Sequence, residues 1–256
     1  MNARGEKGTG QETIPIFAGL GFDYIELPLA QVMDLDEPEF NELLKTIGSE
    51  GIPLEACNNF FPPRIRLTGE EAILGSALEY AGRAFERAAA MGAKVIVFGS
   101  CGAKNIPAGF PHDRARLQLI ELLRNLQDMV KPYNITIALE PVNTRESNFI
   151  ISAAEGLEIV RELSLDNIKL LIDYYHMRME NEDPRIISRA GKVLRHLHIA
   201  SREKRLFPKP DDNEDYRGFF DLLKNAEYDG RISIEAKSES LAEDGSISLK
   251  LLRSLA

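Results

Sequence analysis

The chain has 256 residues, of which 44% are hydrophobic and 28% are charged, and this suits one α/β barrel of roughly 250 residues. Its formal net charge of −9 argues against a nucleic-acid partner. No apolar run reaches the ~18 residues of a membrane span, the N-terminus lacks the apolar core of a signal peptide, and only two cysteines occur, so we expect one cytoplasmic domain over 1–256 with no membrane partner.

Strand and helix signals alternate along the chain. Amphipathic patterns at 76–92 and 114–130 predict helices, and Gly51, Gly92 and Gly230 are expected to end helices. Seven apolar or β-branched runs after turn residues are typical of buried strands: 22–28, 52–58, 93–99, 135–141, 168–174, 193–200 and 231–237. The alternation predicts a parallel sheet with right-handed crossovers, and hence a (β/α)₈ TIM barrel.

The first strand of such a barrel is missing from this pattern. It would precede a helix at about 10–20, where the polar stretch MNARGEKGTG is unsuited to a buried strand. Two interpretations remain open: the gene start was assigned too late, or the barrel is open at its first position. An open barrel would leave two strands with unpaired edges, which favours association into a homo-oligomer.

Four strands in the second half of the chain end in a polar residue of a metal-binding type. The runs ITIALE, KLLID, RHLHIA and ISIEA carry Glu140, Asp173, His198 and Glu235. Because barrel active sites gather at the carboxyl ends of the strands, these four side chains are expected to meet. Carboxylates and one imidazole suit a divalent ion such as Mn²⁺, Mg²⁺ or Co²⁺.

Each of these residues also has an ordinary structural interpretation. Glu140 or Glu235 alone fits a salt bridge or a helix cap equally well, whereas a lone Asp173 after KLLI would be costly to bury without a partner. His196 lies two residues before His198, on the same face of the strand, and we expect it to be a hydrogen-bonded residue one layer deeper. His112, at the start of a helix pattern, is expected to be a surface or capping residue.

The segments GFDYIELPLA, ALEPVN, LIDYYHM, HLHIAS and YDGRISIEA resemble the xylose-isomerase-like superfamily of barrel sugar isomerases and epimerases. Within it, the chain is most similar to the ketose 3-epimerases and their hydroxypyruvate-isomerase relatives. The resemblance implies that Glu140, Asp173, His198 and Glu235 bind one divalent metal ion, with Mn²⁺ as the first choice and Mg²⁺, Co²⁺ or Zn²⁺ as alternatives. It also implies that Glu140 and Glu235 are the catalytic acid and base.

The same resemblance implies substrate contacts from Glu146 and His176. Where the epimerases have an arginine, six residues after the ligand histidine, this chain has Lys204, flanked by Arg202 and Arg205. We therefore expect Lys204 and Arg202 to bind substrate, from a charged loop that is a candidate lid over the barrel mouth.

The predicted metal ligands permit proton abstraction α to a carbonyl, through an enediolate whose charge a divalent ion stabilises. Epimerisation, isomerisation and dehydration of a keto-inositol all share this constellation and stay open. The loops after the last two strands lack a Gly-rich phosphate-binding turn, which favours an unphosphorylated sugar or keto-sugar substrate. Phe60, Phe61 and Tyr174 could form the apolar wall that selects it, or simply pack.

Two other functions are compatible with a barrel of this type. An AP endonuclease needs a three-zinc cluster with more histidines than the four present in this chain, so we reject that interpretation. A C-glycoside-cleaving subunit that works only with a partner protein stays open, since a missing first strand would fit dependence on a partner.

Overall fold

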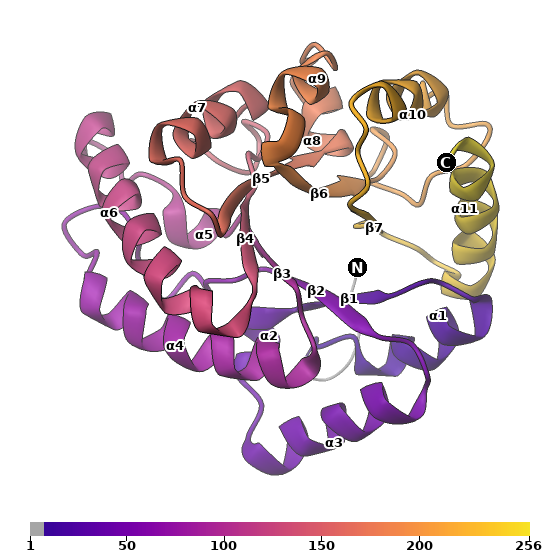
Figure 1. The fold of residues 1–256 in the computed structure, drawn as a ribbon, viewed down its shortest axis with the longest axis horizontal. Helices are drawn as coiled ribbons and strands as arrows, with labels where there is room; N and C mark the ends of the chain where they lie inside the picture. Colours follow the sequence, from indigo (N-terminus) through magenta and orange to yellow (C-terminus); the bar gives the residue numbers. More distant parts are fainter. Residues whose placement is uncertain (1–7) are drawn as a thin grey trace.

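The computed structural model describes residues 8–256 and shows one parallel sheet of seven strands inside a ring of helices (Figure 1). Neighbouring strands in the sheet follow chain order, from β1 to β7. All seven predicted strands are present, each slightly shorter than its sequence pattern. They are β1 (Ile25–Pro28), β2 (Leu54–Asn58), β3 (Val95–Phe98), β4 (Thr136–Leu139), β5 (Ile168–Asp173), β6 (Leu194–Ile199) and β7 (Arg231–Ile234). The TIM-barrel fold class is thereby confirmed. The stretch from which the first strand is missing in the sequence pattern falls mostly on residues 1–7, which lie outside the described residues.

The helices connect successive strands and cover the outside of the sheet (Figure 1). The patterns at 76–92 and 114–130 correspond to α4 and α6. The α-helices are α1 (Ile14–Leu20), α2 (Leu29–Met33), α3 (Glu37–Ser49), α4 (Leu74–Met91), α5 (Cys101–Lys104), α6 (His112–Val130), α7 (Ala153–Leu163), α8 (Tyr174–Met179), α9 (Ile186–Ala190), α10 (Tyr216–Asn225) and α11 (Leu241–Leu255). Three short 3-10 turns are η1 (Gln11–Thr13), η2 (Lys131–Tyr133) and η3 (Gly191–Val193). No helix among residues 8–256 is long and apolar enough to cross a membrane.

Two of the three glycines predicted to end helices do so. Gly92 caps α4 in the left-handed conformation, with φ 96°, and Gly51 follows α3 with φ 70°. The prediction for Gly230 is wrong, because α10 already ends at Asn225. There the chain turns with Glu227 in the left-handed region, at φ 52°, and Gly230 only leads into β7.

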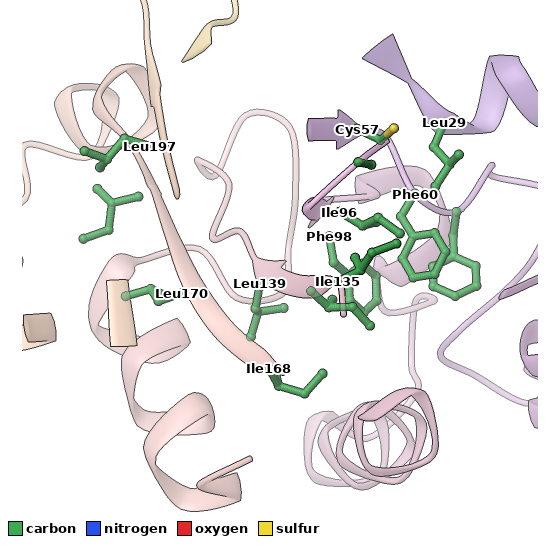
Figure 2. Packing of buried hydrophobic residues seen from close by; sticks show 14 of the residues in the cluster. Leu29, Cys57, Phe60, Ile96, Phe98, Ile135, Leu139, Ile168, Leu170 and Leu197 are labelled. Atoms are coloured by element: carbon green, nitrogen blue, oxygen red, sulfur yellow. The ribbon is translucent and has the colours of Figure 1, made fainter. Parts of the chain in front are cut away.

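The core lies between the sheet and the helices, and Figure 2 shows part of it. Phe60 and Phe61 follow β2, with ring centroids 4.0 Å apart, and the Phe60 ring lies 6.0 Å from that of Phe98. Phe60, Phe61 and Tyr174 are at most 2% exposed. Of the two interpretations of these aromatics, packing is therefore the one that the structure supports.

The sheet is not closed by a backbone ladder among the described residues, because β1 and β7 are its two edges. Side chains join these edges instead: Tyr24 Oη lies 2.7 Å from Ser233 Oγ, and the Arg231 guanidinium lies over the Tyr24 ring. We call this junction the seam. A cavity of about 270 Å³ lies along it, beneath the contact between α1 and α11.

Candidate metal centre and active site

The four predicted ligands come from four consecutive strands. Asp173 is the last residue of β5, His198 lies near the end of β6, and Glu140 and Glu235 directly follow β4 and β7. Parallel strands bring these positions to one end of the barrel, as expected. One ligand atom from each of the four residues lies within 4.8 Å of those of the other three. The structure therefore brings all four together, and their role as ligands stays a prediction.

The centre of the cluster is the Nδ1 atom of His198. It lies 3.3 Å from Oε1 of Glu140 and 3.3 Å from Oε2 of Glu235. Glu140, Asp173 and His198 are 7%, 3% and 0% exposed. His198 Nδ1 and Glu140 Oε1 are both buried and neither makes a hydrogen bond. Buried polar atoms without partners are costly, and a divalent cation bound among these oxygen and nitrogen donors would satisfy both, so the residues fit a metal ion.

The other nitrogen of His198 meets a residue that the sequence analysis missed. Nε2 lies 2.9 Å from Oε1 of Glu26, and Nε2 of His196 lies 2.9 Å from Oε2 of the same carboxylate. Glu26 is the one acidic residue within β1 and is 6% exposed. The argument that a carboxylate in an apolar strand needs a partner, which drew attention to Asp173, would have identified it. His196 is a hydrogen-bonded residue deeper in the barrel, as expected.

The loop after β6 contributes Arg205 rather than the predicted Lys204. Arg205 Nη2 lies 3.2 Å from Asp173 Oδ2 and also contacts Glu235, while Nη1 lies 3.4 Å from Glu146 Oε2. Lys204 and Arg202 have exposed side chains. Lys204 and Arg205 both have positive φ, 58° and 55°, so the chain turns sharply there and neighbouring side chains diverge. Arg205 therefore occupies the place expected for Lys204, and substrate binding by Lys204 and Arg202 stays a prediction.

The two predicted substrate contacts lie beside the cluster and share a partner. Asn143 Nδ2 lies 2.7 Å from Nδ1 of His176 and donates to Oε1 of Glu146 at 3.1 Å. His176 Nε2 lies 3.5 Å from Oδ2 of Asp173. His176 is 5% exposed, whereas Glu146 is exposed on its loop. His112, at the start of α6, is exposed as expected.

Two further residues hold Glu235 and Glu140 in place, one through a carboxylate and one through the backbone. Asn58, the last residue of β2, donates from Nδ2 to Oε1 of Glu235 at 2.6 Å. Lys104, which is 0% exposed, donates from Nζ to the backbone oxygen of Glu140 at 2.9 Å. Burial lowers the pKa of the Lys104 ammonium. Asn58 lies at a strand end, as the predicted ligands do, whereas Lys104 lies at the end of α5 and does not follow from strand-end patterns.

Burial and neighbouring charges shift the pKa values of Asp173, Glu235 and His198 in opposite directions. Burial raises the pKa of Asp173 to about 7 against the charges of Arg205 and His198, which lower it. For Glu235, burial is outweighed by the charges of Arg205 and His198, and the pKa lies well below its usual range. Burial opposes the charge on His198, but Glu26 and Glu235 raise its pKa well above 6.5. Burial and the charge of Arg205 lower the pKa of His176 to about 3.

Comparison with known proteins places this arrangement in a family. The family model described as "Xylose isomerase-like TIM barrel" matches residues 16–255, nearly the whole chain. The chain belongs to this family. Membership agrees with the resemblance inferred from the sequence and with the order of strands described above.

Among curated relatives, D-psicose 3-epimerase of Agrobacterium fabrum is 28% identical over 74% of this chain and 66% of its own length. Hydroxypyruvate isomerase of Escherichia coli is 29% identical over 63% of this chain and 62% of its own length. The chain thus spans slightly less than two thirds of each. A crystal structure of D-allulose 3-epimerase from Methylomonas in complex with D-allulose superposes with a TM-score of 0.85 at 22% identity, over 96% of this chain and 91% of that one. At that identity the likeness shows a shared fold.

Proposed function

We propose that this chain is a divalent-metal-dependent epimerase or isomerase of an unphosphorylated ketose or keto-sugar. The observation that carries the proposal is the convergence of Glu140, Asp173, His198 and Glu235, with ligand atoms within 4.8 Å of one another. Relatives named as a ketose 3-epimerase and a hydroxypyruvate isomerase support the reaction class. Mn²⁺ is the proposed ion, because carboxylate oxygens dominate the donor set.

When bound, the ion would act as a Lewis acid that makes the hydrogen next to the substrate carbonyl easier to remove. Glu235 is the proposed base, since the charge of Arg205 keeps it ionised. Asn58 binds its Oε1, which leaves Oε2 on the side of His198. Glu140, on the other flank of His198 Nδ1, is the proposed acid. Return of the proton to the same carbon gives epimerisation, and return to the neighbouring carbon gives isomerisation.

Arg205, His176 and Glu146 are the proposed substrate contacts. They form a chain of polar groups along one side of the cluster, connected through Asn143 and Asp173. Arg202 and Lys204, exposed on the same loop, are proposed to meet the far end of the substrate or a closing lid. The proposal of an unphosphorylated substrate rests on the loops after β6 and β7, which lack a Gly-rich phosphate-binding turn close behind the strand.

Deuterium wash-in tests the proposal directly. The Mn²⁺-loaded chain is incubated in ²H₂O with free ketoses, inososes and 3-ketoglycosides, and proton NMR follows each C–H position. Exchange at the carbon next to the carbonyl, accompanied by an epimer or isomer, is the expected result. Loss of water would indicate a dehydratase, and exchange only after addition of a partner protein would favour the C-glycoside-cleaving subunit. Absence of exchange across the panel contradicts the proposal.

A further inference from the structure

Glu26 is placed to control the orientation of His198. Its two oxygens each meet one histidine: Oε1 lies 2.9 Å from Nε2 of His198, and Oε2 lies 2.9 Å from Nε2 of His196. The carboxylate and both imidazoles are buried, at 6%, 0% and 0% exposure. Ser233 donates a further hydrogen bond to Oε2 and is itself bonded to Tyr24. Glu26 is therefore held from β7 as well as β6.

This contact determines which ring nitrogen is available on the other side. An ionised carboxylate only accepts hydrogen bonds, so Nε2 of each histidine must carry the proton. Oε2 of Glu26 also accepts from Ser233, so the two oxygens together meet three donor groups, as an ionised carboxylate does. Nδ1 of His198 is then the nitrogen that faces Glu140 and Glu235, at 3.3 Å from each.

We propose that Glu26 is a positioning residue that selects Nδ1 of His198 as the metal-binding nitrogen. This inference rests on the proposed function, since that function supplies the metal. A carboxylate bonded to the far nitrogen of a ligand histidine fixes the ring and makes it a stronger ligand, and loss of such a partner typically lowers metal affinity by about 10–100-fold. Glu26 touches neither the ion nor the substrate in this role.

Glu26, His196 and His198 are also close enough to one another to hold a separate metal ion. The hydrogen bonds argue against that alternative, because they occupy both oxygens of Glu26 and the Nε2 atoms of both His196 and His198. A titration of the unmodified chain with Mn²⁺ separates the two cases. One ion per chain is expected, and two ions per chain would overturn the positioning role.

Variants in a His196→Leu background isolate the bond to His198. With His196 gone, the amide of Glu26→Gln can still accept from Nε2 of His198 and can donate to Ser233, whereas Glu26→Leu removes the acceptor altogether. Calorimetry with Mn²⁺ should give Glu26→Gln/His196→Leu an affinity between those of His196→Leu and Glu26→Leu/His196→Leu, because the amide still holds the ring but lacks the charge that strengthens the ligand. Glu26→Leu/His196→Leu should bind Mn²⁺ about 10–100-fold more weakly than His196→Leu does. Glu86→Gln is the control, since Glu86 is exposed on α4 and lies outside the seam.

The protonated nitrogen can be observed without any substitution. In the Zn²⁺-loaded chain with ¹⁵N-labelled histidine, two-bond ¹H–¹⁵N spectra should place the proton of His198 on Nε2 and the metal on Nδ1. A spectrum with the reverse assignment overturns the inference even if the double variants fail to fold. Equal Mn²⁺ affinity in all the variants overturns the positioning role alone. If the unmodified chain binds no Mn²⁺, the metal of the proposed function fails and this inference fails with it.

Discussion

Gly99, directly after β3, lies so close to Glu140 that a Cβ atom at position 99 would overlap Oε2 of Glu140. The absence of a side chain on one strand end thus makes room for a predicted ligand on the next. Gly99→Ala should displace the Glu140 carboxylate, and a shift of about 1 Å at a reacting group can lower turnover about 100-fold. Kinetics with any confirmed substrate measure this effect. Gly48→Ala in α3, where an added Cβ meets nothing within 4 Å, should leave turnover unchanged.

Asp173→Asn should abolish Mn²⁺ binding. The substitution removes the negative charge and preserves the shape, and the amide oxygen can still accept the hydrogen bond that Oδ1 receives from the Tyr175 backbone at 2.8 Å. Isothermal titration calorimetry measures the effect. Asp183→Asn, at an exposed position paired with Arg185, is the control. Unchanged Mn²⁺ affinity in Asp173→Asn would remove this residue from the ligand set.

Glu235→Gln should reduce turnover far more than it reduces fold stability. A positioned base typically contributes about 10²–10⁴-fold to rate. Turnover is measured at saturating Mn²⁺, so that a weaker affinity for the metal does not lower the rate. The free energy of unfolding is measured by urea unfolding. The exposed Glu239→Gln serves as the control. A near-normal rate in Glu235→Gln would exclude its role as the base.

Glu182 should give the stability of the fold a pH dependence that is separate from the predicted metal ligands. Its oxygens accept from the backbone N–H of Ala153, at 2.9 Å and 3.2 Å, and burial raises its pKa from 4.5 to about 7. Because folding raises the pKa of this carboxyl, the folded state holds its proton more tightly than the unfolded state does. The contribution of Glu182 to the free energy of unfolding therefore declines as pH rises from about 4.5 to about 7.

Glu182→Gln should remove this contribution, because an amide keeps an acceptor for Ala153 and does not ionise. Thermal melts of the metal-free chain from pH 4.5 to 8 should show the variant gaining stability over the unmodified chain as pH rises, with a constant difference above about pH 7. Glu158→Gln, exposed on α7, should follow the unmodified chain throughout. Parallel melting curves for Glu182→Gln and the unmodified chain would contradict the pKa shift.

Phe60→Ala should destabilise the fold by about 3–5 kcal/mol, because it opens a hole in a filled aromatic cluster. The Phe60 ring is 0% exposed and lies 5.5 Å from that of Phe85, and its backbone oxygen accepts from Tyr80 Oη. Urea unfolding measures the loss. Leu117→Ala, at a position 66% exposed on α6, should change the free energy of unfolding little. A similar free energy of unfolding for the two variants would show that the aromatic cluster repacks to fill the space of the lost ring.

The strands and the four polar strand ends could be predicted from the sequence because both follow local patterns. Each strand is a continuous apolar run, and a parallel sheet brings equivalent ends together whatever the loops do. Arg205 could not be distinguished from Lys204 in this way, since two consecutive positive φ values decide which side chain turns inward. A carboxylate in an apolar strand marks Glu26 as a residue that needs a partner, but its partners could not be predicted, because His196 and His198 are about 170 residues away and meet it only when the barrel forms.

The seam has a consequence for how the barrel assembles and opens. Its direct bonds join residues more than 200 positions apart, Tyr24 with Ser233 and Glu26 with Ser233, so the entropy of closing a very long loop opposes them. We expect contacts of such high sequence separation to form late in folding, and to be the weakest part of the ring because no backbone ladder joins β1 to β7 among residues 8–256. In hydrogen-exchange experiments the amides of β1 and β7 should therefore exchange before those of β3 and β4. Since the seam also anchors Glu26, a transient opening there would release His198 while the rest of the fold stays intact.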